Sequence, residues 1–139
     1  MTSDKAFLDT NIFVYAFDRS APKKRQLARE LISESIRLRF GVISTQVLQE
    51  LYVVGTRKLG ILPEILKTAM ESLKPLQMVI MTPQLIFRSI DTQIRWQISF
   101  WDAMILQAAN HAQCTLLYTE DLTHGHQYGS VKAINPFQS

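Results

Sequence analysis

Four carboxylates, those of Asp9, Glu50, Asp102 and Asp121, lie among residues that a soluble domain normally buries. Asp9 and Asp121 each follow an apolar run, and Glu50 and Asp102 stand within apolar patterns of helical period. Burial of a carboxylate is costly unless its charge has a partner. A hard divalent cation is the simplest partner that all four could share. The four acids therefore predict a metal site.

The chemistry expected of such a site is hydrolysis of a phosphodiester bond. Four carboxylates within roughly 6 Å would raise one another's pKa unless cations neutralise them. One or two Mg²⁺ or Mn²⁺ ions fit, because hard ions take oxygen ligands and leave positions for water and phosphate. One ion would turn a bound water into the nucleophile, and the other would stabilise the leaving 3′ oxygen. No side chain need act as a covalent nucleophile.

A framework must bring these acids together, and short apolar runs alternating with helical patterns predict an α/β fold. We expect a single domain over residues 1–139 with a central, mainly parallel sheet flanked by helices. The expected strands are Lys5–Leu8, Gly41–Ile43, Gln77–Met81, Thr115–Tyr118 and Val131–Ile134. The expected helices lie near Ile12–Phe17, Lys23–Leu38, Thr45–Leu59, Pro63–Leu73, Pro83–Gln97 and Phe100–Ala112. Ligands of such sheets bind beyond the carboxyl ends of the strands, where Asp9 and Asp121 stand.

Several helix ends have local chemical signals. Pro63 and Pro83 suit the first turn of a helix, and Gly60 suits the position after a helix. The segment from Ser99 to Asp102 is typical of a capping box. The helix near 23–38 is expected to bury a stripe and to expose a basic, solvated face. The stripe is Leu27, Leu31, Ile32, Ser35 and Leu38, and the basic face is Lys23, Lys24, Arg25 and Arg29.

Each of the four acids also has a purely structural explanation. Asp9 could cap a helix, and Glu50 could reach water from the edge of an apolar stripe. Asp102 could serve as the capping-box acid, although its other oxygen would still be free to bind a metal. Asp121 could be a turn residue, with the neighbouring Glu120 as the ligand instead.

Other side chains near these segments allow two interpretations. His124 and His126 are expected to be solvated, because no soft-metal set accompanies them; contact with RNA phosphate is the alternative. Arg57 and Lys58 would complement the dipole at the end of their helix, and could also lead a phosphate chain to the metal. Trp101 is expected to pack in the core rather than to shield the site.

Composition agrees with a globular protein that acts on a polyanion. The chain has 139 residues, a formal charge of +3 and a pI near 9.2, and it is long enough to bury a core. Apart from the four acids, eight acidic residues face 15 basic ones, which suits a phosphate chain. Cys114 is expected to be a buried thiol. The N-terminal residues resemble neither a signal peptide nor a membrane span, so a soluble, cytoplasmic protein is expected.

Four segments occur in an order and spacing typical of a known family. They are Phe7-Leu8-Asp9-Thr10-Asn11-Ile12, Gln49-Glu50-Leu51, Phe100-Trp101-Asp102-Ala103 and Tyr118-Thr119-Glu120-Asp121-Leu122. With the ending Asn135-Pro136-Phe137, they make nearly the whole chain resemble the PIN-domain family. Within that family, the likeness is to the VapC-type toxin ribonucleases of type II toxin–antitoxin systems.

This resemblance implies a three-layer, Rossmann-like fold and a metal-dependent endoribonuclease. The catalytic and metal-binding acids would be Asp9, Glu50, Asp102 and Asp121, holding one or two Mg²⁺ or Mn²⁺ ions. Their ligands or water would be oriented by Thr10, Asn11 and Thr119. The Thr-x-Asp spacing favours Asp121 over Glu120 as the fourth ligand. The resemblance also implies an RNA substrate, a small antitoxin bound across the site, and a homodimer.

Two other functions compete with this one. An aspartyl-phosphate enzyme with Asp9 as nucleophile would need an acid two residues later, where this chain has Asn11, which cannot do acid–base work. A non-catalytic RNA- or protein-binding module on the same fold would be expected to have lost acids, whereas this chain keeps all four.

Overall fold

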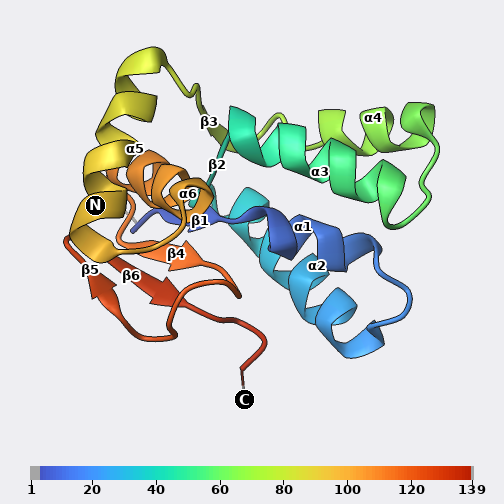
Figure 1. The fold of residues 1–139 in the computed structure, drawn as a ribbon. Helices are drawn as coiled ribbons and strands as arrows, with labels where there is room; N and C mark the ends of the chain where they lie inside the picture. The colour runs from blue at the N-terminus through green and yellow to red at the C-terminus, as the bar shows by residue number, and fades with distance from the viewer. Residues whose placement is uncertain (1–3, 139) are drawn as a thin grey trace.

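The computed structural model describes residues 4–138, which fold around a six-stranded sheet (Figure 1). Its strands are β1 (Ala6–Leu8), β2 (Gly41–Ser44), β3 (Gln77–Val79), β4 (Leu116–Tyr118), β5 (Gln127–Tyr128) and β6 (Val131–Ile134). Their order in the sheet is β3-β2-β1-β4-β6-β5, and all neighbours are parallel except β5 and β6. The predicted mainly parallel sheet is confirmed. The two-residue β5 was not predicted, because it is too short to show a pattern.

Six helices flank this sheet within the described residues. They are α1 (Thr10–Phe17), α2 (Pro22–Arg37), α3 (Thr45–Arg57), α4 (Pro63–Glu71), α5 (Pro83–Trp96) and α6 (Phe100–His111). The helices α5 and α6 pack together on one side, and α1 to α4 lie on the other (Figure 1). This follows from right-handed crossovers, since the chain moves outward from β1 to β3 and then returns across the sheet to β4. No helix within residues 4–138 combines the length and hydropathy needed to span a membrane.

The register of the central strands sets up the site. Leu8 of β1 lies opposite Tyr118 of the parallel β4, so the two strands end side by side. The backbone N–H of Asp9 donates to the Tyr118 carbonyl at 3.0 Å. Asp9 and Thr119 therefore emerge together at the carboxyl edge of the sheet, as expected for adjacent parallel strands.

The local signals at the helix ends mostly act as predicted. Pro63 and Pro83 are the first residues of α4 and α5, and Gly60 follows α3 with φ +66°. The Ser99 hydroxyl accepts from the backbone N–H of Asp102 at 3.1 Å, which caps α6. Capping fixes the first turn of α6 and hence the place of Asp102.

The predicted apolar stripe of α2 is partly wrong. Leu27 and Leu38 are 42% and 49% exposed, and the fully buried positions are Ala28 and Ser35. Leu31 and Ile32 pack partly against the core, as expected. The prediction is thus confirmed at Ser35 and missed Ala28, so the buried face of α2 is centred on two small residues.

The core fills both sides of the short central strands. Phe7, Leu8, Ile43 and Leu117 are fully buried. Cys114, two residues before β4, is also buried, and burial raises the pKa of its thiol to about 12. The prediction of a buried thiol is confirmed.

Candidate metal centre

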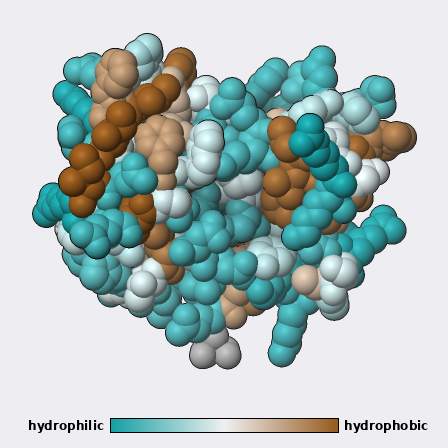
Figure 2. Space-filling view, in the orientation of Figure 1, coloured by the Kyte–Doolittle hydropathy of each residue, from teal (hydrophilic) through white to brown (hydrophobic). Residues whose placement is uncertain are grey.

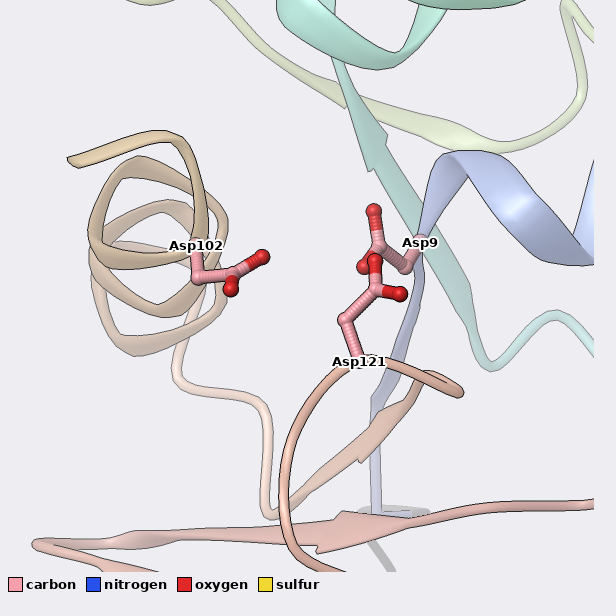
Figure 3. Close-up of side chains that lie close together, drawn as sticks. All are labelled: Asp9, Asp102 and Asp121. Atoms are coloured by element: carbon pink, nitrogen blue, oxygen red, sulfur yellow. The ribbon is translucent and has the colours of Figure 1, made fainter. Parts of the chain in front are cut away.

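Three of the predicted acids converge at the carboxyl edge of the sheet. Asp9 follows β1, Asp102 lies in the first turn of α6, and Asp121 lies in the loop after β4. One carboxylate oxygen from each lies within 4.8 Å of the others. Figure 3 shows the three side chains directed toward one another from these separate elements. Three carboxylates at this spacing can ligate one hard cation.

Asp9 is the buried member of this cluster, with 4% of its surface exposed. Its Oδ1 accepts from the Thr10 N–H at 2.7 Å, which caps α1, and its Oδ2 accepts from the Thr119 hydroxyl at 2.8 Å. Burial raises the pKa of Asp9 from 3.8 to about 7, despite these two bonds. The nearby charges of Asp121 and Glu50 contribute to this rise. The Asp9 side chain therefore caps α1 and also belongs to the acidic cluster.

Asp121 is fixed by two neighbours of the same edge. The Asn11 side-chain amide donates to Asp121 Oδ2 at 3.1 Å, and the Asp121 N–H donates to the Thr119 hydroxyl at 3.1 Å. Partial burial and the nearby Asp102 carboxylate raise the pKa of Asp121. A neighbouring cation would relieve both penalties.

Glu50 stands apart from the three aspartates, although it lines the same cavity. Its Oε1 accepts from the Thr10 hydroxyl at 2.6 Å, and its Oε2 accepts from the Gln46 side-chain amide at 3.4 Å. Thr10, the residue next to Asp9, thus joins the start of α1 to α3. The structure brings three of the four predicted acids into direct proximity, and the fourth lines the same cavity, bonded to Thr10.

Glu120, the alternative to Asp121, lines the same cavity but is not one of the three clustered acids. Its Oε1 accepts from the Tyr15 hydroxyl at 2.7 Å and its Oε2 pairs with the Lys24 ammonium at 2.7 Å. These bonds keep the pKa of Glu120 below its usual value even though partial burial opposes this. Of the two neighbouring acids, Asp121 is the one in the cluster.

A cavity of about 680 Å³ opens above the three aspartates. Lys58 is the one cationic side chain that lines it within residues 4–138. Trp101 also lines it and is 60% exposed, so the prediction that Trp101 packs in the core is wrong. The Trp101 ring meets the ring of its neighbour Phe100 edge-on, with 5.7 Å between the ring centres.

Comparison with known proteins identifies the family. A family model described as the PIN domain matches residues 6–126, which hold all of these site residues. The chain belongs to the PIN-domain family. No curated protein sequence matches it.

Three solved structures share this PIN fold, each with a TM-score of 0.68. VapC20 of Mycobacterium tuberculosis, described as a sarcin–ricin loop cleaving toxin, is 17% identical over 84% of this chain and 90% of its own. A toxin–antitoxin complex from Klebsiella pneumoniae is 20% identical over 97% and 100%. A DNA-bound VapBC from Salmonella typhimurium is 18% identical over 94% and 97%. At these identities the likeness establishes the fold, which is that of VapC toxins.

In this PIN domain, three residues that sequence reasoning missed also support the site. Gln46 lies one turn before Glu50 on α3, and its amide bonds both Glu50 and the Trp101 carbonyl. Tyr15 and Lys24 hold Glu120. Only Gln46 had a signal in the sequence, since the fourth residue before a helical acid lies on the same face.

His124 and His126 lie outside the acidic cluster. His124 Nδ1 accepts from the Asn135 N–H at 2.9 Å. The His126 ring lies 4.4 Å from that of Tyr128 and 6.0 Å from that of Trp96. Among residues 4–138 neither is in a metal-ligand group.

Proposed function

We propose that residues 1–139 form a single PIN domain that is a divalent-metal-dependent endoribonuclease, the toxin of a toxin–antitoxin pair. The observation that carries the proposal is the convergence of Asp9, Asp102 and Asp121 within 4.8 Å at the carboxyl edge of the sheet. Membership of the PIN family and the VapC-like fold support the same activity.

The donor set fits Mg²⁺ or Mn²⁺. All the candidate ligands are carboxylate oxygens, which hard cations prefer, and the cavity leaves room for water and a phosphate. The raised pKa of Asp9 is the cost of a buried carboxylate without a cation. When bound, a divalent cation would supply Lewis-acid activation of water and stabilise charge on the phosphate.

The remaining site residues would orient these acids. Thr119 and the Thr10 N–H hold the two oxygens of Asp9, and Asn11 holds Asp121. Thr10 holds Glu50 through its hydroxyl. Glu50 would add the fourth negative charge of the catalytic set from the cavity lining, and the bond from Thr10 would hold its carboxylate in place.

RNA is the proposed substrate because the cavity places one cationic side chain, Lys58, beside the acidic cluster. Lys58 would contact a phosphate next to the scissile one, which the three aspartates would face through the metal. Trp101 presents an exposed ring at the same cavity, and exposed aromatic rings stack unpaired RNA bases. An excess of basic over acidic residues outside the site would aid binding of the polyanion.

A small antitoxin is the proposed protein partner. Two of the structures with this fold are described as a toxin–antitoxin complex and as VapBC. The cavity has an apolar wall of Val14, Val53 and Val54 beside its acids. An antitoxin segment with apolar side chains and one basic side chain would match both surfaces and block RNA. A cytoplasmic location follows from this role as part of the proposal.

Replacement of Asp9 tests the proposed activity. Asp9→Asn should lower Mg²⁺-dependent RNA cleavage by about a hundredfold or more, because it removes a ligand charge, while circular dichroism stays unchanged. Asp91→Asn, on the exposed surface of α5, makes the same change in charge and should cleave like wild type.

Two outcomes would contradict the proposal. Equal cleavage by wild type and Asp9→Asn would reject the site. RNA binding by wild type without cleavage in Mg²⁺ or Mn²⁺ would favour the non-catalytic module instead.

A further inference from the structure

Glu120 lies between two residues of the metal centre in sequence but is bonded away from it. Its neighbours Thr119 and Asp121 contact Asp9 and Asn11. Both oxygens of Glu120 are instead occupied at 2.7 Å, one by the Tyr15 hydroxyl of α1 and one by the Lys24 ammonium of α2. An acid next to a metal ligand is thus restrained by two helices.

Lys24 is itself held in a defined place. Its ammonium donates to the Tyr15 hydroxyl at 3.2 Å and lies 4.6 Å from the centre of the Tyr15 ring. It also lies 5.6 Å from the centre of the Phe137 ring, which meets Tyr15 edge-on at 4.9 Å. Two aromatic faces and two oxygens surround the cation, so its position is specified despite a side chain that is 40% exposed.

These contacts fix three successive side chains after β4 to three different places. Thr119 is bonded to Asp9, Glu120 to Lys24 and Tyr15, and Asp121 to Asn11. The Thr119 N–H adds a bond to the Ile134 carbonyl of β6 at 3.0 Å. If Glu120 were released, Asp121 would keep two bonds at 3.1 Å, that from the Asn11 amide to its carboxylate and that from its own N–H to the Thr119 hydroxyl.

We propose that Lys24 and Tyr15 are positioning residues of the metal centre. They hold Glu120 outside the cluster and thereby orient Asp121 toward Asp9 and Asp102. This inference rests on the proposed function in one respect, that the three aspartates bind a divalent cation. It concerns only the geometry of the ligands and needs no particular RNA.

The position and the charge of Lys24 predict opposite effects on metal binding. Lys24→Met removes one positive charge near the site and leaves Glu120 unpaired, so electrostatics alone would make Mn²⁺ bind more tightly. Loss of positioning would weaken binding, by about tenfold, because partners that orient ligands contribute 10- to 100-fold to metal affinity. The sign of the change separates the two roles.

Isothermal titration with Mn²⁺ in the absence of RNA measures this sign. We expect about tenfold weaker binding for Lys24→Met and unchanged binding for Lys23→Met. Lys23 is the neighbouring exposed lysine on α2, so its variant makes the same charge change without the Glu120 contact. Lys24→Arg retains a cation that can pair with a carboxylate, and it should bind within about threefold of wild type.

A second substitution tests whether Glu120 transmits the effect. Lys24→Met combined with Glu120→Gln leaves no free carboxylate beside Asp121, so it should regain at least part of the lost affinity. This coupling would not arise from a general loss of stability. Thermal melting in EDTA should show the variants equally folded at the titration temperature.

Several outcomes would overturn the proposal. If Lys24→Met binds Mn²⁺ as tightly as wild type or more tightly, Lys24 affects the site only through its charge and does not position a ligand. Absence of recovery in the double variant would reject Glu120 as the intermediary. Asp9→Asn separates this failure from that of the proposed function, because normal Mn²⁺ binding by Asp9→Asn would instead reject the metal centre itself.

Discussion

Asp9 is the residue at which burial and charge conflict most strongly. It is 4% exposed, and its pKa rises from 3.8 to about 7 chiefly because burial disfavours the charged form. The hydrogen bonds from Thr10 and Thr119 reduce this rise without cancelling it. A cation at the site would cancel it, since ligation requires the carboxylate to be ionised.

The stability of the metal-free protein should therefore fall as pH rises. Below about pH 4, Asp9 is protonated in both states; above that, the unfolded chain loses the proton first, and the folded protein retains it up to about pH 7. The folded state then binds more protons, so Asp9 lowers the free energy of unfolding by up to about 1.4 kcal/mol per pH unit in this window. Urea unfolding in EDTA between pH 5 and 8.5 measures it.

Asp9→Asn isolates this effect from that of other titrating groups. The difference in unfolding free energy between wild type and Asp9→Asn should change across the window and level off above about pH 7. Saturating Mg²⁺ should remove most of the pH dependence from wild type. Parallel curves for the two proteins would contradict the raised pKa of Asp9.

Residue patterns predict the place of the site better than its contacts. Strand-end position was enough to place Asp9 beside the loop that carries Asp121, because parallel strands share an edge. The bonds of Thr119 to Asp9 and of Asn11 to Asp121 each join residues 110 apart, so no local pattern contains them. Trp101 was assigned to the core because hydropathy does not distinguish a cavity wall from an interior.

At the scale of elements, Gly41 sets how closely α2 approaches β2. It is buried at the start of β2, and an added Cβ would lie 2.5 Å from Leu76 Cδ2 and 2.8 Å from Ser35 Oγ. The Cβ of Ser35, which cannot rotate away, would be 2.9 Å from it. Small residues on both sides of this contact let the helix lie flat on the strand.

Gly41→Ala should therefore destabilise the protein by about 1–3 kcal/mol, the usual cost of overpacking. Urea denaturation in Mg²⁺ measures the change. Leu76→Val removes the atom nearest to the added Cβ, so Gly41→Ala should cost less in the Leu76→Val background than in wild type. Equal costs in the two backgrounds would show that Leu76 does not oppose the substitution.

Elements with end signals were predicted more accurately than elements defined by pattern alone. Proline and serine marked the starts of α4, α5 and α6, because those residues act through the local backbone. The stripe of α2 was misassigned at Leu27 and Leu38, since hydropathy does not show which face of a helix its tertiary neighbours cover. The strand β5 depends on pairing with β6 and has no separate signal.

At the scale of the whole molecule, α5 presents an apolar face to solvent. Phe87, Ile90 and Ile94 are 67%, 44% and 70% exposed and follow helical spacing. Figure 2 shows a brown and tan stripe over the region that α5 occupies in Figure 1. A contiguous apolar face of this kind is typical of a protein contact. We propose it as the interface of the homodimer that the family resemblance implies.

Charge placed on α5 should dissociate this dimer. Ile94→Glu would bury an unpaired carboxylate in the proposed interface, so multi-angle light scattering after gel filtration should show a dimer for wild type and a monomer for the variant. Ile65→Glu is the matched control, because Ile65 of α4 is 60% exposed but lies on another helix; this variant should remain dimeric. A monomer produced by Ile65→Glu alone would move the interface to α4. If wild type is monomeric at all concentrations, the α5 face does not join two copies of the chain.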